Sequence, residues 1–304
     1  MCDLTKAIYT DKEAARKHLE AIRWPAGAYC PHCGEAENVK LLEGKSHRPG
    51  LHKCYSCNGH FTVTVGTVFE RSKVPLNKWV LASHLFASSK KGISAHQLHR
   101  TIGVTYKTAW FMLHRLREAA TDNNDNQLGG PGKTVEVDET FIGNDRTIKP
   151  KGQKKGRGFY HKYKVLTLVE RGGKARSFHI PSTSAQTLRP ILNKQLNSAS
   201  TVYTDEAGQY TLTKEPMFRD HEYVSHGIGE YVRGGVHTNS IEGFFSIFKR
   251  GMKGIYQHCS KGHLKRYLAE FDFRYNYRAK LGYNDEERAA ILLAGISGRR
   301  LQYK

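Results

Sequence analysis

The order of strand-like and helix-like segments in the second half of the chain limits its possible folds more than any other feature. Residues 134–143 alternate apolar and polar side chains as a strand does, and Asp138 lies in the middle of this segment. Gly172 and Gly173 favour a hairpin further along. The segments after the first are predicted as strand, strand, helix, strand, strand and helix, over residues 163–170, 175–180, 184–196, 200–205, 221–225 and 237–250.

This order predicts an α/β domain with an RNase H-like fold. In that fold the first strand lies in the centre of the sheet, and the fourth strand lies beside it. We therefore expect Asp138, on the first strand, and Asp205, at the end of the fourth, to point into one site.

The helix predicted over residues 237–250 supplies a third acidic side chain. At about 100° per residue, the segment has an apolar face and a separate polar stripe. The apolar face consists of Ile241, Phe244, Phe245, Phe248 and Met252, and the polar stripe of Asn239, Glu242, Ser246 and Lys249. Glu242 can therefore face a site while the opposite side of the helix is held in a core.

Three carboxylates at close range repel one another unless cations lie among them. Two Mg²⁺ (or Mn²⁺) ions fill this role in phosphodiester chemistry, because they activate the nucleophile and stabilise the leaving oxygen. Asp138, Asp205 and Glu242 are therefore the candidate catalytic metal ligands. A carboxylate binds Mg²⁺ more strongly than an amide oxygen does, which favours Glu242 over Asn239 as the third ligand. Lys249 is suited to a DNA phosphate.

Cysteine spacing near the N-terminus predicts a second metal site. Two pairs, Cys30-Pro-His-Cys33 and Cys54-Tyr-Ser-Cys57, are separated by residues 34–53. A two-residue gap lets a tight turn place both thiolates of a pair on one metal, so the four cysteines are the expected Zn²⁺ ligands of a structural zinc ribbon. Disulfides are the alternative, which a reducing compartment disfavours. Residues 60–69 alternate as a strand. Such a ribbon binds either nucleic acid or a protein surface.

Residues 93–117 follow a helix predicted over 76–89 and indicate a helix-turn-helix. Ser94 and Thr105 are the predicted N-caps of its two helices, and Gly103 allows the tight turn between them. The alternative is a plain helical hairpin.

The second of these helices carries the candidate DNA contacts. Tyr106 and Lys107 lie at its beginning, where a recognition helix meets base edges and phosphates. His114, Arg115 and Arg117 are candidate phosphate contacts further along.

The charge of the chain also indicates DNA. With 48 Lys plus Arg against 28 Asp plus Glu, the formal net charge of the 304 residues is +20, which calls for an acidic partner. Lys154 and Lys155 belong to a basic, glycine-containing segment over 147–158, which is either an arm that grips DNA beside the active site or a solvated loop. The apolar stretches are too short to span a membrane, and no secretion signal is visible, so we expect a cytoplasmic, nucleoid-associated protein.

Several motifs together resemble those of one known family. Val-Asp138-Glu-Thr-Phe-Ile-Gly, Tyr-Thr-Asp205-Glu, the segment from His237 to Gly251 and the segment 270–278 look like bacterial insertion-sequence transposases related to Merlin elements. The resemblance, which includes the zinc ribbon, implies a DDE-type transposase. Such an enzyme cleaves the terminal repeats of its element and joins the 3′-hydroxyl to target DNA. Because transposition requires two ends, a homodimer or larger assembly on DNA is expected.

The family resemblance reopens the choice of the third ligand. Many members are described with Asn at the third catalytic position, followed by a Lys, which here are Asn239 and Lys249. Both Glu242 and Asn239 therefore remain candidates. The alternatives to a transposase are a zinc-ribbon DNA-binding regulator that has lost the reaction and a nuclease that cleaves without joining.

The expected domains follow from these segments. They are an N-terminal segment with the zinc ribbon over 1–70, a helical DNA-binding region over 71–121, a linker over 122–133 and the RNase H-like domain over 134–304.

Overall fold

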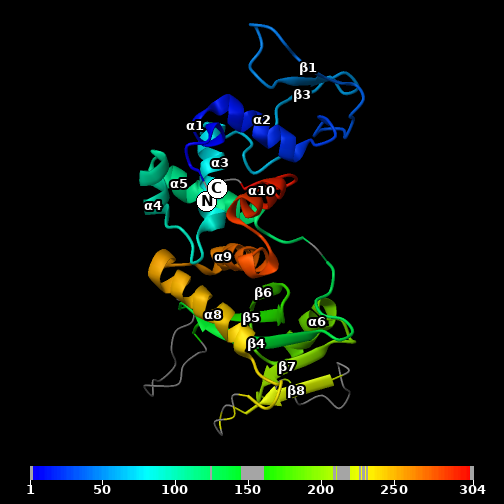
Figure 1. The fold of residues 1–304 in the computed structure, drawn as a ribbon, viewed down its shortest axis with the longest axis vertical. Helices are drawn as coiled ribbons and strands as arrows, with labels where there is room; N and C mark the ends of the chain where they lie inside the picture. The colour runs from blue at the N-terminus through cyan, green and yellow to red at the C-terminus, as the bar shows by residue number, and fades with distance from the viewer. Residues whose placement is uncertain are drawn as a thin grey trace. The chain divides into compact units, whose positions relative to one another are not determined.

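The computed structural model describes residues 3–123, 125–144, 161–207, 210, 220–225, 227, 230 and 232–301. The chain forms two compact units (Figure 1). The first consists of Met1–Thr121 together with Tyr283–Lys304, and the second of Asp122–Gly282. Among the described residues, no helix is both long and apolar enough to cross a membrane.

The first unit begins with the zinc ribbon and its supporting helices. After α1 (Ala7–Thr10) and α2 (Lys12–Arg23), the strands β1 (Val39–Leu41), β2 (His52–Cys54) and β3 (His60–Phe61) form an antiparallel sheet in that order. Rings of Trp24, His52 and Phe61 pack against one another with centroids 5.1–5.9 Å apart. This aromatic cluster gives the small ribbon a core of its own.

The strand expected over 60–69 is wrong beyond Phe61, because the chain there follows a series of turns. The amides of Val65 and Thr67 donate to carbonyls three residues back, and the Thr67 hydroxyl donates to the carbonyl of Thr64. Gly66 has a φ of +72°, which a strand does not allow. Local hydrogen bonds from turn amides and a threonine hydroxyl thus replace the strand that the alternation predicted.

Helices make up the remainder of the first unit: α3 (Leu76–Ser88), α4 (Ala95–Ile102), α5 (Tyr106–Ala119) and α10 (Asp285–Ala294). The predicted caps of the helix-turn-helix are confirmed. Ser94 accepts a hydrogen bond from the Gln97 amide, and Thr105 accepts one from the Thr108 amide. Gly103 ends α4 in the left-handed region with a φ of +62°.

The compact units divide the chain differently from the expected domains at the C-terminal end. Residues from 283 onward, expected to continue the RNase H-like domain, belong to the first unit. There α10 packs on α2, α3 and α5. Arg288 donates to the carbonyl of Ala87 at 2.9 Å, and Arg299 donates to the carbonyl of Ala119 at 2.8 Å. An apolar stretch such as that of α10 does not reveal in sequence which core it joins.

The second unit is built on a five-stranded sheet in the order β6-β5-β4-β7-β8. Its strands are β4 (Thr134–Ile142), β5 (Tyr163–Glu170), β6 (Ala175–Ile180), β7 (Thr201–Asp205) and β8 (Asp220–Val224). The first three pair antiparallel, whereas β7 and β8 run parallel to β4. With the first strand central and the fourth beside it, this is the RNase H-like order expected from the sequence.

Helices cover both faces of this sheet. On one face, α6 (Ala185–Gln195) contributes Leu188 and Leu192 to an apolar cluster with Val135 and Val137 of β4. On the other face, α8 (Asn239–Gly251) crosses β4 and β5, while α9 (Lys261–Asn276) packs on β6. A π-helical turn, η2 (Met252–Tyr256), continues from α8, and the short η3 (Ala279–Leu281) follows α9.

The apolar face predicted for α8 is confirmed. Ile241, Phe244, Phe245, Phe248 and Met252 are all buried in the cluster that lies between α8, α9 and the sheet. This burial fixes the rotation of the helix, so its polar stripe faces away from the core.

Leu292→Ala is expected to destabilise the first unit by about 2–5 kcal/mol, because Leu292 is fully buried in α10. All three tryptophans of the chain, Trp24, Trp79 and Trp110, lie in this unit. Tryptophan fluorescence during urea unfolding therefore measures the effect directly. The matched control is Leu268→Ala, which removes a buried leucine from the second unit. Equal shifts of the tryptophan transition in both variants would contradict the assignment of α10 to the first unit.

Candidate active site and zinc cluster

The register of the sheet sets the two candidate aspartates side by side. Thr134 pairs with Thr201, and Glu136 pairs with Tyr203, in the parallel ladder between β4 and β7. Two residues further along each strand lie Asp138 and Asp205. Side chains two apart on a strand share a face, so both carboxylates lie on the face that α8 covers. Glu139 lies on the opposite face, where the Tyr210 hydroxyl donates to it at 2.7 Å.

The polar stripe of α8 is the third part of the candidate site. Asn239 and Glu242 are exposed, and Lys249 is partly buried. The Thr238 hydroxyl donates to Glu242 at 3.2 Å and so restricts its carboxylate from the preceding turn. Lys249 lies close enough to Asp138 to oppose its pKa shift electrostatically.

Electrostatics single out Asp138 within the site. Desolvation, together with the neighbouring carboxylates of Asp205 and Glu139, raises the pKa of Asp138 to about 8. The Glu139 amide and Lys249 act in the opposite direction. A carboxylate whose charge is so poorly satisfied by the protein is suited to a bound cation.

The spacing of the three carboxylates is wider than a single closed metal site requires. In the part of the chain that the structure describes, only the four cysteines form a group of at least three Cys, His, Asp or Glu ligand atoms within 4.8 Å of one another. Asp138, Asp205 and Glu242 as a set are therefore further apart. Ligands on the outer sides of two ions can be about 8 Å apart, because the ions lie about 4 Å from each other and each ligand about 2 Å from its ion.

An ion pair between the buried Glu136 and the partly buried Arg171 holds α8 in place, and sequence reasoning missed it. Glu136 is fully buried on β4, two residues before Asp138 and on the same face. One of its oxygens accepts a hydrogen bond from Arg171 Nε at 2.7 Å, and the other accepts one from the amide of Ile241 at 2.9 Å. Glu136 therefore caps the N-terminus of α8 from a different element, where a negative charge is favourable.

Glu136 and Arg171 together form a clamp on the start of α8, and Arg171 also holds the segment that leads into this helix. Its guanidinium donates to the carbonyls of Gly235 and His237 at 2.8 and 2.6 Å and contacts His237 Nδ1 at 2.8 Å. Because Nδ1 must accept this bond, the imidazole hydrogen lies on Nε2. The available sequence signal was a second carboxylate on this strand, two residues from the candidate aspartate and therefore on the same face.

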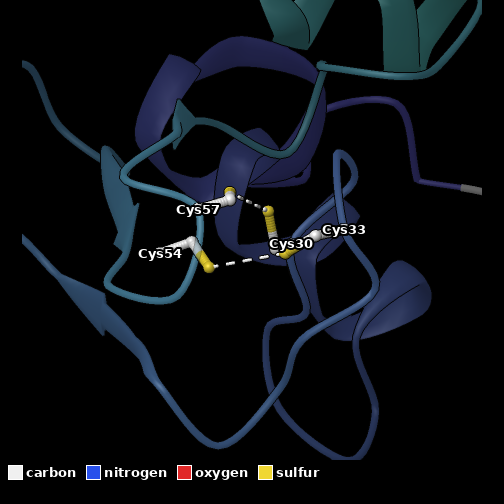
Figure 2. Close-up of side chains that lie close together, drawn as sticks. All are labelled: Cys30, Cys33, Cys54 and Cys57. Atoms are coloured by element: carbon white, nitrogen blue, oxygen red, sulfur yellow. Dashed lines mark hydrogen bonds between the residues drawn. The ribbon is translucent and has the colours of Figure 1, made fainter.

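The four cysteines come together as predicted (Figure 2). The sulfurs of Cys30 and Cys57 are 3.6 Å apart, and those of Cys33 and Cys54 are 3.7 Å apart. Sulfurs at the corners of a tetrahedral zinc site lie about 3.8 Å apart, since each Zn–S bond is about 2.3 Å. Backbone N–H groups, first of all that of Cys57, lower the pKa of Cys54 to about 7, whereas the pKa values of Cys33 and Cys57 are raised, so Cys54 is the thiolate that forms most readily in this cluster.

Known proteins share both of these regions. The ISXO2-like transposase domain matches residues 127–276, and the transposase zinc-ribbon domain matches residues 10–60. An uncharacterized protein in transposable element ISH50 of Halobacterium salinarum is 34% identical over 282 residues, covering 88% of this chain and 92% of that protein. This chain belongs to the ISXO2-like transposase family. It is an insertion-sequence transposase with an N-terminal zinc ribbon.

One solved structure is also similar to this transposase. It is the simian T-cell lymphotropic virus intasome in complex with PP2A regulatory subunit B56 gamma. The identity is 12%, and the TM-score is 0.28, over 59% of the transposase. The transposase spans 63% of the length of the matched chain. Similarity at this level does not establish a shared fold.

The predicted DNA contacts of the transposase fall in different environments. Tyr106 and Lys107 are exposed at the start of α5, and Tyr106 stacks on His96. Arg115 donates to the carbonyl of Glu70 at 3.1 Å and lies over the ring of Phe111. Its guanidinium thus contacts the protein itself.

The prediction of phosphate contacts by His114 and Arg117 is wrong. Each is 1% exposed, because the C-terminal half of α5 is buried on nearly all sides. Lys154 and Lys155 lie outside the described residues.

In magnesium-free buffer, Asp138→Asn is expected to stabilise the transposase increasingly as pH rises. The pKa of Asp138 is about 8 in the folded chain, against its usual 3.8. As pH rises, the unfolded chain therefore releases this proton at a lower pH than the folded chain does. Between pH 3.8 and about 8, the unfolding free energy of the wild type falls by up to about 1.4 kcal/mol per pH unit. Urea unfolding at several pH values measures the difference. Asp125→Asn, at an exposed position, should follow the wild type; a stabilisation independent of pH would contradict the assignment.

The purified transposase is expected to contain about one zinc per chain at the four-cysteine cluster. Cys54→Ser removes one ligand and should lower the zinc content measured by elemental analysis. Cys259→Ser, which lies outside the cluster, should retain it. Zinc well below one equivalent in the wild type would argue against the four-cysteine site.

Proposed function

We propose that this transposase cleaves the ends of its insertion element and joins the freed 3′-hydroxyl to target DNA at one two-metal site. Water attacks the phosphodiester in the first step, and the 3′-hydroxyl attacks the target in the second. Asp138, Asp205 and Glu242 would hold two Mg²⁺ (or Mn²⁺) ions, and such ions would supply activation of the attacking oxygen and stabilisation of the leaving one. Lys249 neutralises a DNA phosphate beside Asp138.

The observation that carries this proposal is the register that aligns Asp138 with Asp205 on one face of an RNase H-like sheet. A structural role does not account for this pairing, since two carboxylates on neighbouring strands repel each other and raise the pKa of Asp138. Because the chain belongs to a transposase family, DNA is the substrate that we propose for this phosphodiester chemistry.

Glu242 is our choice for the third ligand, with Asn239 as its competitor. Both are exposed on the first turn of α8. The carboxylate has the stronger affinity for Mg²⁺, and the hydroxyl of Thr238 orients it.

The remaining roles follow from the substrate. Tyr106 and Lys107 are proposed to contact DNA at the start of α5, with Arg115 a further candidate, and Lys154 and Lys155 to contact DNA near the active site. We expect a homodimer or larger assembly, because two element ends must be joined to one target. Action on chromosomal DNA implies a location with the nucleoid in the cytoplasm.

Alanine substitution of Asp138, Asp205 or Glu242 is expected to lower cleavage of terminal-repeat DNA by at least about 100-fold, because each loses a metal ligand worth several kcal/mol in the transition state. Gel analysis of cleaved strands in Mg²⁺ gives the rate. Glu222→Ala, an exposed glutamate on β8, is the matched control and should cleave normally. Unchanged cleavage in all three site variants would refute the mechanism.

Two further comparisons use the same assay. If Asn239→Ala abolishes cleavage and Glu242→Gln does not, Asn239 is the third ligand. Joined products distinguish a transposase from a nuclease that cleaves without joining, and tight binding without cleavage in the wild type would indicate a regulator.

A further inference from the structure

A cavity of about 540 Å³ lies at the C-terminal end of β4. Its walls come from the second half of β4, the start of β5, the end of α8, the π-helical turn η2 and the start of α9. Cavities of this size hold small molecules or parts of larger ligands.

The position of the cavity follows from the different lengths of β4 and β7. Strand β7 ends at Asp205, which is level with Asp138, whereas β4 continues to Ile142 and pairs there with Tyr163 of β5. The cavity begins with Glu139 and Thr140, directly after Asp138. Lys249 lines the cavity and also acts electrostatically on Asp138, so the cavity lies beside the proposed catalytic site.

The walls of the cavity combine cations with apolar surface. Lys162, Lys249 and Lys253 supply positive charge, and Lys249 also acts electrostatically on Asp138. Tyr163, Met252 and Leu264 are buried and form an apolar floor. Lysines attract phosphate, and an apolar floor accepts a base or sugar, so the two features together match one nucleotide.

The backbone beside the cavity is irregular in two places. The α-helical path of α8 changes to a π-helical turn at Met252–Tyr256, and Gln257 then adopts a φ of +57°. Both conformations are costly for ordinary residues and gather at functional sites. Met252, Lys253 and Gln257 all line this cavity, so the irregular backbone shapes its wall.

We propose that the cavity binds one nucleotide of the DNA strand next to the phosphodiester that is cut, extruded from the base stack. Its phosphate lies against Lys249 and Lys253, and its base or sugar rests on the apolar floor. This inference rests on the proposed function, because it takes DNA as the substrate. Extrusion costs the stacking of one base on its neighbours, which these contacts offset.

The test uses the full-length chain and terminal-repeat duplexes that carry 2-aminopurine on either side of the cleaved phosphodiester. Fluorescence of 2-aminopurine rises several-fold when the base leaves the stack. A rise is expected at one position with the wild type and is expected to be lost in Lys253→Ala. The matched control is Lys265→Ala, an exposed lysine of α9 that does not line the cavity; it should retain the rise.

A second measurement uses Cys259, a partly exposed wall residue of the cavity. Bound terminal-repeat DNA is expected to slow its reaction with N-ethylmaleimide several-fold, whereas inorganic phosphate at equal ionic strength should not. Equal protection by phosphate would reduce the cavity to an anion site and overturn the nucleotide proposal.

The outcomes separate this inference from the function on which it rests. Normal cleavage by the wild type without any rise in fluorescence, or with a rise that Lys253→Ala retains, would overturn the nucleotide cavity and leave the transposase mechanism intact. Absence of both binding and cleavage would overturn both proposals.

Discussion

The ion pair between the buried Glu136 and the partly buried Arg171 is the interaction on which the arrangement of the site depends. It joins the central strand to the start of α8 through the Ile241 amide, and it holds the incoming chain through the carbonyls of Gly235 and His237. The apolar face of α8 fixes the rotation of the helix about its axis. An apolar face alone, however, would still allow the helix to slide along that axis. The clamp removes that freedom, and loss of Arg171 would leave the charge of the fully buried Glu136 without its ion-pair partner, which costs up to about 3–5 kcal/mol.

The same strand face carries two carboxylates with opposite electrostatic situations. Glu136 receives a guanidinium and a helix N-terminus from the protein itself, so its charge is satisfied internally. Asp138, two residues later, has the carboxylates of Asp205 and Glu139 as neighbours, and the Glu139 amide and Lys249 compensate its charge only in part. The fold thus neutralises the charge of Glu136, which positions α8. It leaves the charge of Asp138 to be neutralised by a bound cation. The uncompensated charge of Asp138 lowers the stability of the folded chain, and in return it leaves a carboxylate ready to bind a cation.

The parts of this structure that could be predicted from sequence are those with a local signal. Strand alternation around Asp138, the apolar stripe of α8 and the paired cysteines each repeat at a fixed spacing, and the order of elements then gave the sheet. The clamp between Glu136 and Arg171 has no such signal, because the pair forms across the sheet between residues far apart in sequence. The strand was wrongly predicted over residues 62–69 because apolar and polar residues also alternate in turns that threonine hydroxyls stabilise. The roles of Glu242 and Asn239 remain predictions, since one helical turn presents both.

The return of the chain to its first unit has a consequence for biosynthesis. Synthesis passes through the ribbon, α3, α4 and α5, then through the whole RNase H-like unit, before α10 emerges from the ribosome. Until then the helix-turn-helix lacks the helix that packs on α3 and α5, and the carbonyl groups at the end of α5 lack Arg299. The RNase H-like unit can fold as soon as α9 is made. A nascent transposase would therefore complete its proposed catalytic site before its helical unit, and premature termination near the end would harm the helical unit first.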